Sequence, residues 1–131
     1  MPRGAGAQAL RRTPLYVLLL KEEAPMATPL IDELRERVGE VMDLQQAAAV
    51  LHWDQEVNMP PKGAQARGRQ LATLSAHAHR LFTSDTFGAL LGKLETASDR
   101  LKRDDACLVA ETAYDYRRAV QLPEAFVARL G

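Results

Sequence analysis

The sequence has a single cysteine, few aromatic residues and no net charge. Cys107 alone can form neither an internal disulfide nor a zinc–thiolate cluster, which excludes a secreted disulfide-rich scaffold. The 17 Lys and Arg residues balance the 17 Asp and Glu residues, so the basic charge expected of a nucleic-acid-binding domain is missing. Aromatic residues make up 5% of the chain. With Ala and Leu abundant, this composition favours helices over strands.

Long apolar runs are also missing. The run over residues 15–20 follows two arginines, but it is six residues long and Lys21 with two glutamates comes directly after it. It is shorter than the apolar region of a usual export signal and far too short to span a bilayer. We therefore expect residues 1–25 to be a loosely ordered or misannotated extension ahead of Met26. Without an export signal, and with a lone thiol, we expect the protein to be cytoplasmic.

The residues that are present predict an all-α fold. A chain of 131 residues, 47% of them hydrophobic, has room for one domain with a packed core. Apolar residues recur at three- and four-residue steps through residues 26–131, which is the period of an amphipathic helix. We expect about four helices and the start of a fifth. We expect helices from Thr28–Pro29 to the Met59–Gly63 segment, over residues 64–82, from the break at 83–85 through Leu94, over residues 101–121, and from Leu122–Pro123 onward.

The same periodicity predicts which side chains form the core. In the first helix these are Ile31, Leu34, Val38 and Val41, while residues 47–51 are apolar nearly all round and should be buried on several sides. The Met59–Gly63 segment, with two prolines, ends this helix. The core residues expected in the later helices are Leu71, Leu74, Ala78, Leu81, Phe87, Leu90, Leu91, Leu94, Ala106, Val109, Ala110, Ala113 and Val120.

The three histidines do not form a metal-binding pattern. His77 and His79 are two residues apart, which places them about 200° apart around a helix axis. His52 and Glu56 are four residues apart and could share a helix face, but no second pair of ligands stands near them in sequence. The H-E-x-x-H pattern of zinc hydrolases does not occur. We therefore expect no metal to be held by this chain.

The other chemically notable side chains favour structural roles. Asp54 and Glu56 lie on opposed faces of a helix, which does not suit an acid–base pair. We expect Asp54 to form an ion pair with a basic neighbour, Arg67 or Arg69. Trp53 lies in an apolar stretch and is interpreted as a core residue. Cys107 is interpreted as a small buried hydrophobic residue, because no histidine is close to it in sequence.

One segment of the sequence is distinctive. Residues 51–61 read L-H-W-D-Q-E-V-N-M-P-P, followed by Arg67, the Q-L-A-T-L run at 70–74 and His79. This pattern resembles the zinc metallocarboxypeptidases typified by carboxypeptidase Taq, in which W-D-Q-E-x-x-M-P-P precedes a small-residue turn and a helix with R-x-x-Q-L-A-x-L. The segments 81–84 and 114–123 resemble its continuation. The resemblance covers about residues 26–131 and implies that they are the amino-terminal helices of a larger, mostly helical metallopeptidase fold.

The resemblance implies an all-helical, cytoplasmic, homodimeric peptidase that uses zinc or cobalt to remove amino acids from peptide C-termini with broad specificity. In that family the catalytic metal is bound by an H-E-x-x-H helix and a later glutamate, none of which has a counterpart in this chain. No catalytic or metal-binding role is therefore transferred to any residue here. The family-signature positions, expected to fix the turn between the first two helices or to line the cleft wall, are Trp53, Asp54, Gln55, Glu56, Met59, Pro60, Arg67 and Gln70.

Three hypotheses for the function follow. The first is an amino-terminal fragment of such a carboxypeptidase, inactive alone, with apolar helix faces exposed because their partner helices are missing. The second is a stand-alone helical bundle that serves as an interaction module. The third is a small metal-binding protein that uses His52, Glu56 and either His77 or His79. We favour the first, because the apolar segment at 47–51 suits part of a larger fold.

Overall fold

The structure, a computed structural model, describes the backbone of residues 15–130 and the side chains of residues 27–130. This part of the chain contains helices and no strands, which confirms the all-α prediction. The five α-helices are α1 (Leu15–Val57), α2 (Ala64–Phe82), α3 (Asp85–Thr96), α4 (Arg103–Ala119) and α5 (Glu124–Leu130). Short 3-10 turns at Pro61–Gly63 and Ser98–Arg100 connect α1 to α2 and α3 to α4. None of the described helices is long and apolar enough to cross a membrane.

Most helix boundaries lie where the local sequence predicts them. Helix α1 ends at Val57, just before the tandem prolines, and α2 spans the expected residues 64–82. The Ser84 hydroxyl accepts a hydrogen bond from the Phe87 amide at 3.3 Å, so Ser84 is the N-cap of α3. The expected break at 83–85 is therefore confirmed. Helix α4 is shorter at both ends than the predicted range of 101–121.

The start of α1 differs from the prediction. The Thr28–Pro29 pair predicts a first turn there, but the helix already begins at Leu15. Residues 15–24 are rich in Leu, Lys, Glu and Ala, which are good helix formers. A proline inside a helix removes one hydrogen bond without preventing helix on either side of it. Of the expected extension over residues 1–25, residues 1–14 lie outside the described part of the chain.

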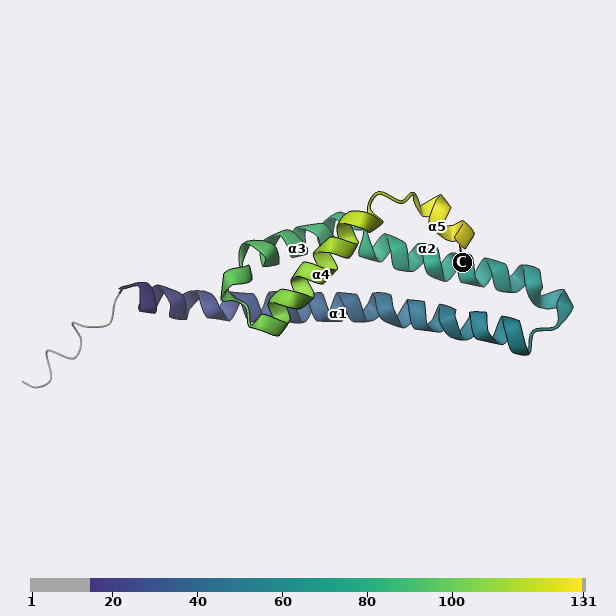
Figure 1. Cartoon of the computed structure of the whole chain (residues 1–131), viewed down its shortest axis with the longest axis horizontal. Coiled ribbons are helices and arrows are strands. Elements are labelled where there is room, and N and C mark those ends of the chain that lie inside the picture. The colour runs from purple at the N-terminus through teal and green to yellow at the C-terminus, as the bar shows by residue number, and fades with distance from the viewer. Residues whose placement is uncertain (1–14, 131) are drawn as a thin grey trace, which may run out of the picture.

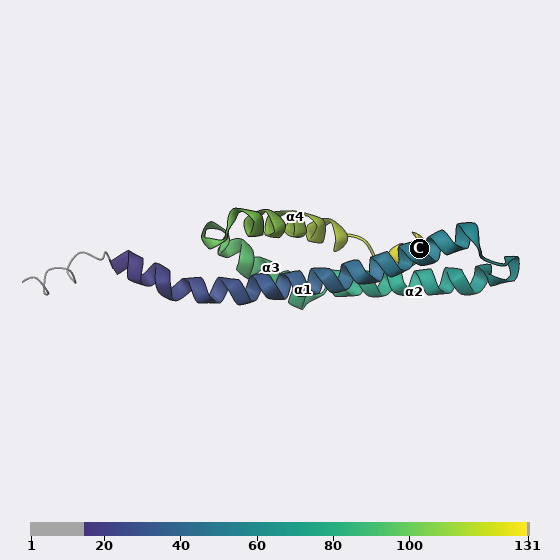
Figure 2. The ribbon, with the colours of Figure 1, turned by 90° about the horizontal axis from the view of Figure 1, so that it is seen from below.

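The helices form a compact head and a long arm (Figures 1 and 2). Helices α1 and α2 run antiparallel as a long hairpin, and α3 and α4 pack beside the amino-terminal half of α1. Helix α5 lies against α2. We call residues 46–74, where the hairpin extends beyond α3 and α4, the arm. We call the region where α1, α3, α4 and the end of α2 meet the head.

The hydrophobic core is in the head. Ile31 and Leu34 of α1 pack against α3 and α4, and the Arg35–Asp105 ion pair joins α1 to α4 at the edge of this core. The aromatic rings of Phe82, Phe87 and Tyr116 lie within 6.3 Å of one another, centroid to centroid. The buried members of the cluster are Ile31, Leu34, Phe87, Leu90, Leu91, Leu94, Val109 and Ala113. All eight were expected in the core from their helical spacing.

Several core predictions are wrong. Ala110 and Cys107 of α4 are exposed, and so is Val120 directly after it, because α4 is covered on one side only. Residues 47–51 are not buried on several sides: Ala48 and Leu51 are half-buried, and the other three residues are exposed. The reason is that this part of α1 lies in the arm, where α2 is its neighbour within the hairpin (Figure 2). Exposed apolar helix faces are the outcome that the fragment hypothesis predicts.

Candidate functional site

The tip of the arm is held by Arg67 of α2. Its guanidinium lies 2.7 Å from the Asp54 carboxylate and donates a hydrogen bond to the Leu51 carbonyl oxygen at 2.6 Å. The same side chain donates from Nε to the Gln70 amide oxygen at 3.2 Å. Arg67 is largely buried, with 17% of its side chain exposed. The predicted pairing of Asp54 with a basic neighbour is confirmed, and Arg67 rather than Arg69 is the partner.

The remaining signature residues surround this contact without forming a catalytic cluster. Gln55 and Met59 are half-buried, whereas Glu56 and Pro60 are exposed. The Met59 side chain lies against Gly63, where an added Cβ would stand 3.1 Å from Met59 Cγ. The arrangement connects the end of α1 to the start of α2 through one ion pair, one hydrogen bond and a small-residue contact.

Trp53 is not a core residue of this chain. Its side chain is 62% exposed, although it stands one position before the ion-paired Asp54. Successive residues of a helix point about 100° apart, so Asp54 can face α2 while Trp53 faces solvent. The interpretation of Trp53 as buried is therefore wrong for the chain as described. A large aromatic side chain in this position is left without cover by the head, because the arm extends beyond α3 and α4.

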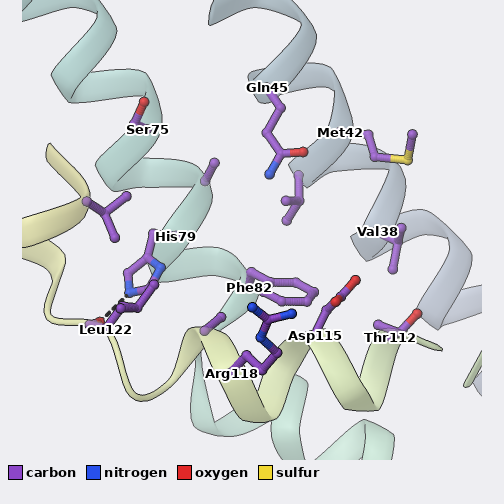
Figure 3. A pocket seen from close by; sticks show the side chains of 14 residues that line it. Val38, Met42, Gln45, Ser75, His79, Phe82, Thr112, Asp115, Arg118 and Leu122 are labelled. Atoms are coloured by element: carbon purple, nitrogen blue, oxygen red, sulfur yellow. Dashed lines mark hydrogen bonds between the residues drawn. The ribbon is translucent and has the colours of Figure 1, made fainter. Parts of the chain in front are cut away.

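A groove of about 640 Å³ lies at the base of the arm, where α1, α2, α4 and the segment around α5 meet (Figure 3). Val38, Val41 and Phe82 contribute apolar surface to it, and Met42 stands at its α1 side. Gln45 extends into the groove from α1, and Asp115 and Arg118 line it from α4. Its size and its mixture of apolar surface and a few polar groups are typical of a small-molecule or peptide-binding cleft.

His79 closes one side of this groove. Its Nε2 lies 2.9 Å from the Leu122 carbonyl oxygen. A carbonyl oxygen can only accept, so Nε2–H donates this bond. The Arg80 guanidinium lies 2.5 Å from Glu124, the first residue of α5. Together the two contacts attach the α4–α5 connection to α2, which gives His79 a structural role here.

The described residues do not provide a metal centre. Among the side chains of residues 27–130, no three His, Cys, Asp or Glu residues come together in a way that could hold an ion. His52 is exposed on the arm. His77 is also exposed and lines a second, smaller pocket together with Arg37 and Arg80. The metal that the family uses does not fit the residues present, so no reaction step is assigned to this chain.

Sequence reasoning did not find the groove. Its polar residues Gln45, Ser75 and Asp115 come from three helices and are each at least 30 residues apart in the sequence. A polar residue within an apolar helix face can indicate a binding site. The sequence does not show, however, which helix faces lie against one another. His79 and the 114–118 segment were singled out by resemblance alone, and both contribute to the groove.

Comparison with known proteins shows a partial match to one family. Residues 33–131 match the family model of the carboxypeptidase Taq (M32) metallopeptidases. The thermostable carboxypeptidase 1 of Thermus thermophilus is 35% identical over 85 residues, which are 63% of this chain and 16% of that protein. Carboxypeptidase 1 of Bacillus subtilis is 29% identical over 80 residues, which are 61% of this chain and 16% of that protein. No solved structure matches the chain.

The matched region contains all the features that define the arm and the groove. It includes the Asp54–Arg67 ion pair, the W-D-Q-E-x-x-M-P-P segment and the residues of α4 that line the groove. The alignments span less than a fifth of the length of either curated relative. The chain belongs to the carboxypeptidase Taq family of metallopeptidases.

Proposed function

We propose that this chain forms the amino-terminal helical segment of a metal-dependent carboxypeptidase and that the metal-binding and catalytic residues stand outside these 131 residues. The observation that carries the proposal is the family match over residues 33–131, combined with its coverage of only 16% of each relative. The H-E-x-x-H pattern does not occur in these 131 residues. By itself the chain is inactive.

The proposal extends to the substrate and the setting of the complete enzyme. Its substrates are peptide C-termini, which it shortens with broad specificity, and its metal is zinc or cobalt. The enzyme is a cytoplasmic homodimer. These properties rest on the family resemblance. Both relatives are named carboxypeptidases, which supports peptide C-termini as the substrate class.

In this proposal the chain forms part of the substrate cleft and contributes no catalytic residue. The Arg67 contacts hold α1 and α2 in a long hairpin, and the arm that results is one wall of the substrate cleft. Eight positions maintain that wall or line it: Trp53, Asp54, Gln55, Glu56, Met59, Pro60, Arg67 and Gln70. A wall built on two long helices can be placed accurately, because its residues do not depend on loops for their position.

The first test is an activity measurement on the 131-residue chain. We expect no release of C-terminal amino acids from an amino-blocked peptide in the presence of added zinc or cobalt, measured as free amino acid by mass spectrometry. A parallel sample with a chelator controls for contaminating peptidases. Release that the chelator abolishes and that zinc or cobalt restores would show that the chain is active and would overturn the proposal.

A stand-alone helical interaction module is the second candidate function. The observation in its favour is the closed core of the head, which buries Phe87, Leu34, Leu94 and Val109 almost completely. Sequencing the source gene past codon 131 separates the two candidates. A continuous reading frame that reaches H-E-x-x-H supports the carboxypeptidase segment, and a stop codon directly after Gly131 supports the module.

A further inference from the structure

An exposed apolar stripe runs along the outer face of α1 in and beside the arm. Met42 is 49% exposed, Val50 65%, Trp53 62% and Val57 59%. At about 100° per residue, the four side chains fall within an arc of about 80° around the helix axis. They therefore lie along one face about four turns long, interrupted only by the exposed Gln46, and we call these four side chains the Trp53 stripe. Exposed apolar surfaces of this kind mark interaction sites.

The fold itself does not cover the stripe. The neighbour of α1 in the arm is α2, and it takes the opposite side, where Arg67 reaches Asp54 and Leu51. Helices α3 and α4 pack farther toward the amino terminus of α1 (Figure 1). Trp53 is the largest apolar side chain on the exposed face. Aromatic residues of this size are the usual anchors of protein interfaces.

The charge around the Trp53 stripe distinguishes between two surfaces that could cover it, a second copy of this chain and a basic partner helix. Residues 38–61 contain no Lys or Arg but include Glu40, Asp43, Asp54 and Glu56. Asp54 is paired with Arg67, whereas Asp43 and Glu56 are exposed and flank the Trp53 stripe on either side. A second copy docked on the stripe would bring two acidic surfaces together, because residues 38–61 of neither copy contain a Lys or Arg. Like charges so placed repel, which disfavours a second copy.

We propose that the Trp53 stripe docks an amphipathic helix with Lys or Arg along its edges, located in the part of the carboxypeptidase polypeptide outside these 131 residues. The inference rests on the proposed function. The length of the relatives supports it, because 84% of each relative lies outside its match with this chain. Trp53 is then the buried anchor, and Asp43 and Glu56 pair with basic side chains at the rim.

The first experiment uses the isolated chain, in which Trp53 is the sole tryptophan. We expect the fluorescence of a solvent-exposed indole and rapid acrylamide quenching at every concentration at which sedimentation shows a monomer. Shielding of Trp53 in the monomer would mean that the chain covers its own stripe. Shielding that grows with concentration together with a dimer mass would mean that a second copy is the occupant. Either result overturns the proposal.

The second experiment supplies the missing polypeptide. The segment of the Thermus relative that aligns with this chain is replaced by the corresponding residues of this chain. Hydroxyl-radical oxidation of Trp53 and Met42 is then compared between the graft and the isolated chain. We expect oxidation of both residues to fall about tenfold in the graft, because a docked anchor excludes water. A folded graft in which Trp53 reacts as fast as in the isolated chain overturns the proposal.

Charge reversal tests the stated chemistry of the partner. In the graft, Asp43→Lys combined with Glu56→Lys should restore oxidation of Trp53, while Glu111→Lys, exposed on α4, should leave it protected. Equal protection in both variants counts against a basic partner.

The docking proposal and the proposed carboxypeptidase function can fail independently. An active graft with an exposed Trp53 contradicts only the docking. A graft that shields Trp53 but releases no C-terminal amino acid contradicts only the carboxypeptidase function. If the graft does not fold, the fluorescence experiment still decides whether the stripe is free.

Discussion

At the scale of single residues, Arg67 illustrates how one side chain can set the geometry of a long hairpin. It contacts a carboxylate, a backbone carbonyl and a side-chain amide, two of them on α1 and one on its own helix. A planar guanidinium with several donors is suited to such a junction, because one rigid group satisfies acceptors on two elements. Trp53, in contrast, lies next to this junction in the sequence, and its side chain is exposed to solvent.

We predict that Arg67→Ala destabilises the isolated chain by about 1–2 kcal/mol, because a charge-assisted hydrogen bond and a partly buried ion pair are lost together. Urea unfolding followed by circular dichroism measures the change. Arg69→Ala is the matched control, since Arg69 is exposed two positions later on the same helix. A comparable loss in both variants would show that the Arg67 contacts do not hold the arm.

A second prediction concerns the close approach of α4 to α3 at Gly88. A Cβ at this position would lie 2.8 Å from Cζ of Tyr116, whose ring is packed beside Phe82 and Phe87 and cannot move freely. Gly88→Ala should therefore destabilise the chain by about 1–3 kcal/mol.

Gly92→Ala provides the control on the same helix, because nothing lies within 4 Å of its added Cβ. It should stabilise the chain by about 0.5–1 kcal/mol through higher helix propensity. Thermal unfolding distinguishes the two variants by the sign of the change in melting temperature. A stabilised Gly88→Ala variant would mean that Tyr116 does not pack on α3 as described.

At the scale of helices, the ends were largely predictable and the covered faces were only partly so. Tandem prolines end α1, and a serine hydroxyl begins α3, because both act through bonds within a few residues. The start of α1 was not predictable in this way, since Thr28–Pro29 resembles a first turn although the helix continues through it. The eight core residues of the head follow the helical period, which identifies a face without naming its partner.

The cap of α3 gives a prediction at this scale. Ser84 accepts from the Phe87 amide and donates to the Leu81 carbonyl at 3.0 Å, so Ser84→Ala should cost about 1 kcal/mol in unfolding free energy. Ser84→Thr keeps the hydroxyl and should retain most of the stability. Chemical denaturation of both variants provides the measurement, and an equal loss in the two would contradict a role for the cap.

At the scale of the whole molecule, the division into head and arm follows from which helices meet. Residues 30–41 of α1 pack against α3 and α4, whereas residues 46–57 of the same helix have α2 as their neighbour. The stability of a segment against local opening depends on the apolar surface it buries. The arm should therefore open more often than the head, although both include the same continuous helix.

Hydrogen exchange tests this difference within one helix. We expect backbone amides of residues 46–57 to exchange at least about tenfold faster than those of residues 30–41, measured by mass spectrometry on the isolated chain. The two segments share one helix and one solution, so each serves as the reference for the other. Uniform protection along α1 would show that the arm is as stable as the head.

The sequence by itself determined the helices, most of their ends, the pairing of Asp54 with a nearby arginine and the family, because each of these depends on residues close together in the chain or on a recognisable motif. Only the tertiary structure decided which apolar faces are covered. Trp53, Val50 and Cys107 are residue types that are usually buried, but here they are exposed. Three polar residues from three different helices, Gln45, Ser75 and Asp115, line the same groove. Burial depends on the position of a partner surface, and helical periodicity identifies an apolar face without specifying what packs against it.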